Sequence, residues 1–348
     1  MFTNTIPTQD FLNSKYWKEV RKRTGNKIVD VNDNLWIQCT KIPVFNFYGG
    51  YIPRADISKI NFDELKEVAK REGIFFIKID PNNLNEARSS KLEARNENSS
   101  VENQESKIND QNVDDRQLTT DNQKSNTQYP ISNIQVQTSD LKLRTSLPVQ
   151  YQHSTVINLE QTEEQFLESM KSKHRYNLKV AEKNAVEVEI SDSNEALDTF
   201  LDLYKKTTLR QGYTGRSASY LKTVFETLKE FNQDLVYIAT ARFEGKAISS
   251  WMLFVYEDTI IYPYGGSSDE NRNVMATYKL VMEIFKWGKS KNKKYFDMFG
   301  IDAKNPEDGY SRFKLGFAGE EVKFADTFDI VYNRFVYFFY KIWEKFNR

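Results

Sequence analysis

A basic residue and an aromatic hydroxyl stand four positions apart at Arg216 and Tyr220, where the sequence predicts the start of a helix. That spacing puts both side chains on one helix face. A forked guanidinium and a phenol on one face can grip a diphosphate, because each charge-assisted hydrogen bond contributes about 1.5–3 kcal/mol. The same residues also fit a surface arginine beside a packed tyrosine.

Lys314 and Asp80 are two further residues whose chemistry could serve a reaction. Lys314 lies in Arg-Phe-Lys-Leu-Gly-Phe at 312–317. A fixed ammonium there could stabilise an oxyanion on a reacting carbonyl, and a solvated lysine between two core phenylalanines fits equally well. Asp80 precedes Pro81. It could act as a general base, although aspartate before proline also serves in caps and turns.

The composition excludes several classes of protein. Lys+Arg and Asp+Glu are both 49, so the formal net charge is zero, which argues against a purely electrostatic nucleic-acid binder. One cysteine, Cys39, and two histidines, His153 and His174, cannot form a common zinc site or an intrachain disulfide. No run approaches the ~20 apolar residues of a membrane span, and no signal peptide is visible at the N-terminus. We therefore expect a cytoplasmic protein without a metal.

A polar segment divides the chain. Between Asn82 and Gln128, Asn, Gln and Ser supply 21 of 47 residues, too polar a mixture to offset the entropy of ordering. We expect residues 83–145 to form a disordered insertion. The domain boundaries that follow are 1–82 (first part of an N-terminal domain), 83–145 (insertion), 146–330 (second domain) and 331–348 (an amphipathic aromatic and basic helix).

Periodicity predicts an α/β (α+β) fold around these boundaries. Turn residues over 48–54 indicate a turn region, and a capping box at Thr162–Gln165 begins a helix that breaks near Ser172. The predicted helices are 11–21, 61–71, 194–209, 217–230, 273–289 and 333–348, and the predicted strands are 36–47, 74–79, 154–159, 234–242, 247–256, 259–264 and 295–299.

Five motifs in a fixed order carry a family resemblance. They are Lys-His-Arg-Tyr-Asn (173–177), Gly-Tyr-Thr-Gly-Arg (212–216), Tyr-Pro-Tyr-Gly-Gly-Ser-Ser (262–268), Tyr-Phe-Asp-Met-Phe-Gly (295–300) and Gly-Tyr-Ser-Arg-Phe-Lys-Leu-Gly-Phe (309–317). In this order they resemble the Fem (FemABX-type) family of aminoacyltransferases that build peptidoglycan interpeptide bridges. The resemblance is good over about 150–335 and weaker over the first 81 residues.

The resemblance implies two fused domains of the Gcn5-related N-acetyltransferase fold, of which the first is shortened and interrupted by the insertion. It also implies an enzyme that takes an amino acid from aminoacyl-tRNA. The acceptor would be an amino group on the stem peptide of a UDP-linked or lipid-linked peptidoglycan precursor. That chemistry implies no cofactor and no metal, since the charged tRNA is a co-substrate.

The resemblance also suggests roles for single residues. Arg216 and Tyr220, with Arg21 four residues after Trp17, match positions that contact the phosphates of the precursor, and Lys314 matches a lysine tied to aminoacyl transfer. Asp80 and the two tyrosines that flank Pro263 match segments near the acceptor. Tyr262 and Tyr264 are expected to share one face of a strand, with Tyr262 the first choice to line the acceptor groove.

Two alternatives remain open. One is an N-acyltransferase of the same fold that uses acyl-coenzyme A or another donor. Against it, the segment 265–272 lacks the glycine spacing that cradles a pyrophosphate and carries two carboxylates. The other is a non-catalytic protein that binds an envelope precursor.

Two basic segments have competing interpretations. Lys286, Lys289, Lys291, Lys293 and Lys294 form either a solvated helix end or a contact for tRNA phosphates. The aromatic stripe of 333–348 either docks on the protein body or contacts the inner face of the membrane peripherally.

Overall fold

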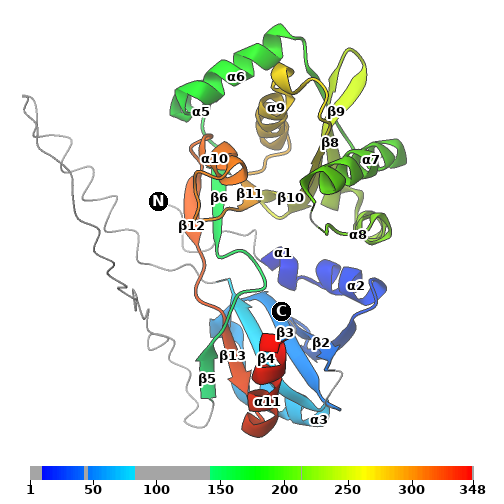
Figure 1. The fold of residues 1–348 in the computed structure, drawn as a ribbon, viewed down its shortest axis with the longest axis vertical. Coiled ribbons are helices and arrows are strands. Elements are labelled where there is room, and N and C mark those ends of the chain that lie inside the picture. Colours follow the sequence, from blue (N-terminus) through cyan, green and yellow to red (C-terminus); the bar gives the residue numbers. More distant parts are fainter. Residues whose placement is uncertain (1–9, 43–45, 83–141, 213, 347–348) are drawn as a thin grey trace, which may run out of the picture. The chain divides into compact units, whose positions relative to one another are not determined.

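Three strands joined by tight turns form the centre of the larger sheet, as the sequence predicts (Figure 1). Glu244 and Gly245 have φ values of 50° and 74°, which suit a two-residue turn between antiparallel strands. The sheet has the order β12-β6-β11-β10-β9-β8-β7. Its strands are β6 (His153–Asn158), β7 (Glu187–Ser191), β8 (Val236–Phe243), β9 (Lys246–Tyr256), β10 (Thr259–Ser267), β11 (Tyr295–Gly300) and β12 (Glu320–Lys323).

The structure is a computed structural model that describes residues 10–42, 46–82, 142–212 and 214–346. The predicted insertion at 83–145 lies outside the described residues except at its C-terminal end. There, Lys142–Thr145 forms strand β5.

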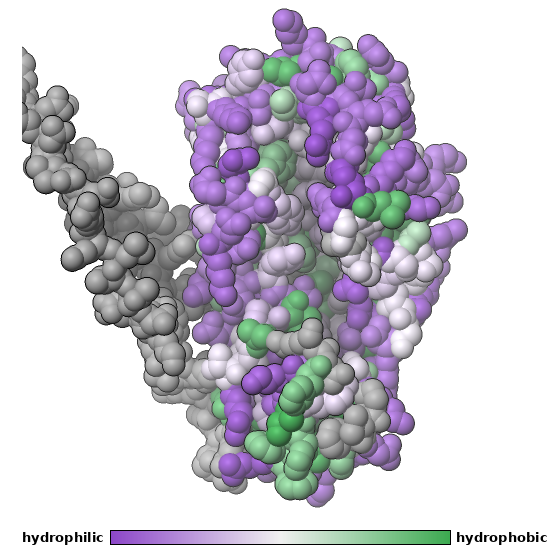
Figure 2. Space-filling view, viewed as in Figure 1, coloured by the Kyte–Doolittle hydropathy of each residue, from purple (hydrophilic) through white to green (hydrophobic). Residues whose placement is uncertain are grey.

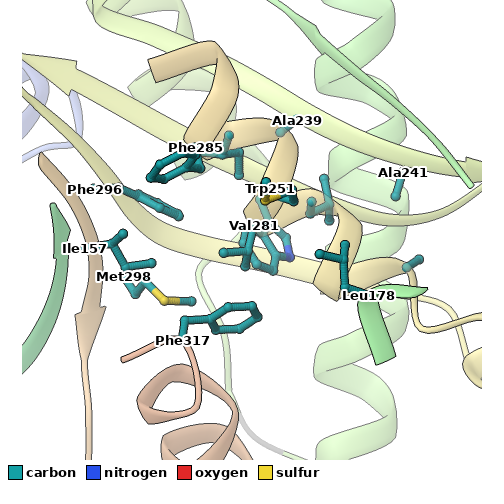
Figure 3. Close-up of a cluster of buried hydrophobic side chains, with 14 of the residues drawn as sticks. Ile157, Leu178, Ala239, Ala241, Trp251, Val281, Phe285, Phe296, Met298 and Phe317 are labelled. Atoms are coloured by element: carbon teal, nitrogen blue, oxygen red, sulfur yellow. The ribbon is translucent and has the colours of Figure 1, made fainter. Parts of the chain in front are cut away.

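One face of the larger sheet is covered by α5 (Glu163–Ser169), α6 (Ser172–Lys183) and α9 (Ala276–Ser290). The capping box at Thr162 is present, and the break before Ser172 confirms the predicted interruption. Figure 3 shows Trp251, Phe285 and Phe296 within the apolar core between these helices and the sheet. α10 (Gly309–Leu315) follows β11.

The opposite face is covered by α7 (Asn194–Gln211), α8 (Ala218–Phe231), α1 (Asp10–Asn13) and α2 (Lys15–Arg23). Ser14 divides the predicted helix 11–21, because its side chain accepts a hydrogen bond from the Trp17 amide and so caps α2. Phe11 and Trp17 pack on Phe254 of β9, with ring centres 5.0 and 5.9 Å away. The N-terminal helices therefore pack against the larger sheet, although the sequence places them in the first domain.

The smaller sheet has the order β1-β2-β3-β4-β13-β5. Its strands are β1 (Lys27–Asn32), β2 (Leu35–Lys41), β3 (Tyr48–Ala55), β4 (Ile74–Pro81), β5 (Lys142–Thr145) and β13 (Phe328–Val331). The helix α3 (Phe62–Arg71), capped by Asn61 as predicted, connects β3 to its parallel neighbour β4. Short 3₁₀ turns occupy Ile57–Lys59, Gln233–Leu235 and Arg272–Val274.

The prediction of a turn at 48–54 is wrong, because this segment is the inner strand β3. Its glycines are needed for close packing. A Cβ on Gly50 would lie 2.8 Å from Ile77 Cγ1 and 2.9 Å from Ile37 Cγ2. The glycine pair therefore lets neighbouring side chains cross the strand, and does not mark a turn.

Two predicted boundaries also need correction. β5 pairs with β13, so the insertion ends before residue 142 and not at 145. β13 pairs with β4, so the chain returns to the smaller sheet before the predicted domain end at 330. Both strands have only four residues, too few for a clear period-2 pattern.

The C-terminal helix α11 (Arg334–Phe346) forms as predicted but presents an unexpected face to the body. Val336 and Tyr337 are buried, and Tyr340 stacks on Phe76 of β4 with ring centres 5.0 Å apart. The residues of the predicted docking stripe that face solvent are Phe335, Phe338, Phe339, Ile342 and Phe346. Figure 2 shows apolar surface over α11 near the lower end of the view. Docking of that stripe on the body is therefore wrong.

Candidate active site

Two arginines and two tyrosines, from α2, α8, β10 and the loop before α8, meet beside the ends of α2 and α8. The Arg21 guanidinium donates through Nη1 to the Tyr220 hydroxyl at 3.2 Å. The Arg216 guanidinium lies 5.1 Å from the centre of the Tyr220 ring, and burial and the neighbouring Tyr220 raise the pKa of Tyr264. We call Arg21, Arg216, Tyr220 and Tyr264 the Arg–Tyr cluster.

Arg21 reaches this cluster because α2 packs on α8. Its Nε donates to Gln38 Oε1 at 2.9 Å, and its Nη2 donates to Asn26 Oδ1 at 3.3 Å. These contacts fix the guanidinium plane while the side chain stays half-buried. A charged donor held in this way loses little further entropy when it binds an anion.

Arg216 directly precedes α8, whose N-cap Ser217 accepts from the Tyr220 amide at 3.1 Å. The Arg216 amide donates to the Tyr204 hydroxyl at 3.2 Å, which ties the start of α8 to α7. The Arg216 side chain is exposed and Tyr220 is half-buried. The predicted pair therefore shares one place at which an anionic ligand can approach from solvent.

Tyr262 and Tyr264 lie on opposite faces of β10, contrary to the prediction. A register shift between Ile261 and Tyr264 places an additional residue in β10 relative to β9, and such a bulge reverses the alternation of side chains. Tyr262 stacks on Trp251 with ring centres 3.9 Å apart. Tyr264 joins the Arg–Tyr cluster.

Lys314 is a buried lysine with 1% of its surface exposed. Its ammonium donates to the carbonyls of Phe299 at 3.2 Å and Gly300 at 2.9 Å, and to the Tyr310 hydroxyl. It lies 5.5 Å from the centre of the Tyr262 ring. The interpretation as a solvated surface lysine is therefore wrong.

Burial lowers the pKa of Lys314 to about 7, and the nearby Asp297 partly opposes that change. Asp297 is itself buried, and its pKa is raised by that burial. Its carboxylate accepts from Ser154 Oγ and from the Phe299 amide. Lysines with such pKa values exchange protons readily at neutral pH, which is typical of functional sites.

Asp80 makes its hydrogen bonds to residues outside both of these groups. Its buried carboxylate accepts from the Tyr51 hydroxyl at 2.7 Å, from the amides of Val149 at 3.2 Å and Gln150 at 2.9 Å, and from Thr327 Oγ1. It therefore holds the end of β4 to the segment before β6. These contacts favour the structural interpretation over a general base, and the predicted substrate contact stays a prediction.

Tyr310, Tyr204 and Gln38 contact the site residues, and no pattern in the sequence assigns them a role. Tyr310 and Lys314 lie four residues apart in α10, so the helical spacing could have paired them. No local signal could have paired Gln38 with Arg21, because that contact depends on how α2 lies beside β2.

Most lysines of the segment 286–294 bind carbonyl or carboxylate groups of the protein itself. Lys289 donates to the carbonyls of Leu159 and Gln161, Lys293 donates to the Glu257 carbonyl, and Lys294 pairs with Asp258 at 2.7 Å. Lys286 pairs with Glu163 at 3.2 Å. The contacts favour a helix end over a contact for tRNA phosphates.

Among the residues that the structure describes, no three His, Cys, Asp or Glu side chains come together as metal ligands. Within the same residues, no helix has both the length and the apolar character that a bilayer span requires.

An α/β fold with two sheets, the Arg–Tyr cluster and a buried lysine in the helix after β11 suit an acyltransferase, and comparisons identify the family. The model of the FemAB family matches residues 1–246 and 237–345, and the chain belongs to that family. The crystal structure of FemX has a TM-score of 0.70 with this chain at 18% identity, covering 95% of this chain and 94% of FemX. The expected family and fold are therefore confirmed.

Two further proteins are similar. UDP-N-acetylmuramoylpentapeptide-lysine N(6)-alanyltransferase of Weissella viridescens is 30% identical over 143 residues, which are 41% of this chain and 41% of that protein. The structure of L-PGS from Bacillus licheniformis has a TM-score of 0.51 at 12% identity, and the alignment covers 96% of this chain and 95% of that one.

Proposed function

We propose that this protein is an aminoacyltransferase that moves an amino acid from aminoacyl-tRNA to an amino group of a peptidoglycan precursor. The observation that carries the proposal is the convergence of Arg21, Arg216, Tyr220 and Tyr264 on the FemX fold. Two guanidinium groups and two phenols supply donors suited to a diphosphate. The similar alanyltransferase is named for a UDP-linked muramoyl pentapeptide acceptor, whose diphosphate matches this chemistry.

In the transfer step, the neutral amine of the acceptor attacks the carbonyl carbon of the aminoacyl ester. The new C–N bond forms, the ester C–O bond to the tRNA ribose breaks, and the proton lost by the amine ends on the ribose hydroxyl. Negative charge develops on the carbonyl oxygen in between. We assign its stabilisation to Lys314 acting through Tyr310, whose hydroxyl accepts from the ammonium and whose side chain is 46% exposed.

We propose that no cofactor takes part, because an aminoacyl ester is already activated toward amines. The turn after β10 disfavours acyl-coenzyme A as the donor. Arg210 pairs there with Asp269 at 3.2 Å and donates to the Ser267 carbonyl at 2.9 Å. Asp269 and Glu270 pair with the cations around this turn, Arg210, Arg272 and Lys246, so these cations are already engaged and are not available to a pyrophosphate. Calorimetry that detects coenzyme A binding would support the acyl-coenzyme A alternative.

The proposed function is tested by incubating the purified protein with a charged tRNA pool and UDP-linked or lipid-linked precursor. Mass spectrometry should find the precursor heavier by one aminoacyl residue, and only when the tRNA is charged. An unmodified precursor that nevertheless binds the protein would mean that it is a non-catalytic envelope-precursor-binding protein.

Charged tRNA and UDP-linked precursors are made in the cytoplasm, so we place the enzyme there, with α11 in peripheral contact with the membrane. The exposed aromatic stripe of α11 supports this contact, and the exposed Arg334 and Lys345 complement anionic lipid headgroups. Such a contact would bring the enzyme to a lipid-linked acceptor.

A further inference from the structure

A strip of lysines on α6 lies beside the helix that carries Lys314. From 171 to 183 the chain has five basic residues and one acidic residue, Glu182. Lys173, Tyr176, Lys179 and Lys183 are exposed and follow one another at spacings of three or four residues, so they form one stripe along the helix. We call these four residues the basic face of α6.

The lysines of this face differ from other lysines of the chain in their ion pairing. In the described part of the chain, Lys173, Lys179 and Lys183 form no ion pair with a carboxylate. The acid of the helix, Glu182, is turned toward α9, where Lys279 lies 3.8 Å away. This contrasts with Lys286, Lys289, Lys293 and Lys294, whose ammonium groups bind carbonyls or carboxylates.

The N-terminal end of α6 is fixed to α10 (Figure 1). The Nε2 atom of His174 is 2.9 Å from the carbonyl oxygen of Phe313, within hydrogen-bond distance. The Lys171 amide donates to the Gly316 carbonyl at 2.9 Å. A Cβ on Gly316 would lie within 2.0 Å of the His174 ring, so α6 and α10 are in direct contact. The basic face therefore starts next to the helix of Lys314.

Tyr176 lies in the middle of the face and is 67% exposed. An exposed aromatic ring among lysines is a platform on which an unpaired base can stack while the ammonium groups contact phosphates. From Lys173 to Lys183 the helix rises about 15 Å at 1.5 Å per residue. That length spans several successive phosphates of a nucleic-acid strand.

We infer that the basic face of α6 binds the acceptor arm of the tRNA and guides its 3′ end toward Lys314. The inference rests on the proposed function, since it names the surface that receives the donor. It gives a protein of zero net charge a local site for a polyanion. Lysine contacts of this kind position the RNA backbone and do not select its sequence.

The test compares Lys173→Gln/Lys179→Gln with the wild-type protein in binding uncharged tRNA over a series of salt concentrations. The two exposed lysines of α3, Lys66 and Lys70, provide a matched control in Lys66→Gln/Lys70→Gln. The α6 variant should bind about tenfold more weakly at low salt, and its salt slope should fall by about 0.7–0.9 per lost contact. The α3 variant should match the wild type.

Tyr176→Ala tests the stacking platform separately. It should weaken tRNA binding about fivefold or more without changing the salt slope. In transfer assays, the α6 variants should raise the KM for charged tRNA and leave the KM for the precursor unchanged.

The failure modes of the inference and of the proposed function are distinct. A wild-type protein that neither binds tRNA nor uses charged tRNA refutes the proposed function, and the inference with it. A wild-type protein that binds tRNA while the α6 and α3 variants bind it equally well refutes the inference alone. Loss of binding to phosphatidylglycerol vesicles by the α6 variant, with tRNA binding intact, would assign the face to a membrane and also overturn the inference.

Discussion

Replacing Lys314 by Met should change the pH dependence of stability in a predictable direction. Burial lowers the pKa of Lys314 from 10.5 to about 7, so between these pH values the unfolded chain binds the proton and the folded chain releases it. Wild-type stability therefore gains from Lys314 as pH rises through this window. From pH 7 to pH 9, that gain in the free energy of unfolding should be about 2 kcal/mol.

Methionine cannot titrate, so the variant should lack this gain. It also loses the hydrogen bonds to Phe299 and Gly300, but that cost is the same at both pH values and cancels in the comparison. The assay is urea unfolding of both proteins at pH 7 and pH 9. The variant should be less stable relative to wild type at pH 9 than at pH 7, by about 2 kcal/mol.

The control is Lys66→Met, which makes the same substitution at an exposed lysine on α3. The same Lys314→Met comparison in an Asp297→Asn background should keep its sign, because the Asp297 carboxyl beside the lysine is then removed and burial still lowers the pKa of Lys314. If the stability of wild type and of Lys314→Met depends on pH in the same way, burial does not lower the pKa of Lys314 as described.

Three further changes test other parts of the structure. Arg216→Ala should weaken calorimetric binding of the precursor by about 1.5–3 kcal/mol, and unchanged affinity would remove the Arg–Tyr cluster from substrate binding. Gly50→Ala should lower the free energy of unfolding by about 1–3 kcal/mol, because its Cβ would meet Ile77 at 2.8 Å; a variant as stable as wild type in urea would contradict the close packing. Phe338→Glu on α11, where the ring is 60% exposed, should leave the melting temperature unchanged and reduce vesicle flotation about tenfold. Undiminished flotation would rule out membrane contact through that face.

Local signals predicted the elements with strong patterns, and tertiary packing decided the others. The capping box at Thr162 and the Asn61 cap gave helix starts that the structure confirms. β3 was missed because Gly49, Gly50 and Pro53 are turn residues in isolation. Only the side chains that cross them from β2 and β4 show why a strand has glycines there.

The orientation of α11 could not be predicted, because both of its faces are aromatic. Its hydrophobic pattern marks the stripe that includes Phe338, yet Tyr337 and Tyr340 make the contacts with β4. The hydroxyl of Tyr337 also donates to the buried Asp329 at 2.6 Å. That polar contact is specific to the packed structure.

Part of the candidate site was predictable from residues that are close in the sequence. The spacing of Arg216 and Tyr220 predicted that they lie together, and the structure brings them together, although Arg216 precedes the N-cap of α8 and is not in the helix. Only the family resemblance assigned Arg21 to the site, because its contact with Tyr220 depends on how α2 packs on α8. The bulge that separates Tyr262 from Tyr264 has no signal in the sequence beyond Pro263.

The central claim is that the Arg–Tyr cluster holds the acceptor while Lys314 serves the transfer itself. Single-turnover transfer from charged tRNA, followed from low to saturating precursor concentrations, tests both parts in one measurement. Lys314→Met should slow transfer by about 10²–10³-fold, Lys314→Arg should recover only part of the rate, and Arg216→Ala should approach the wild-type rate once precursor saturates. A Lys314→Met protein that transfers at the wild-type rate, or wild-type protein that shows no transfer from any charged tRNA, would contradict the account.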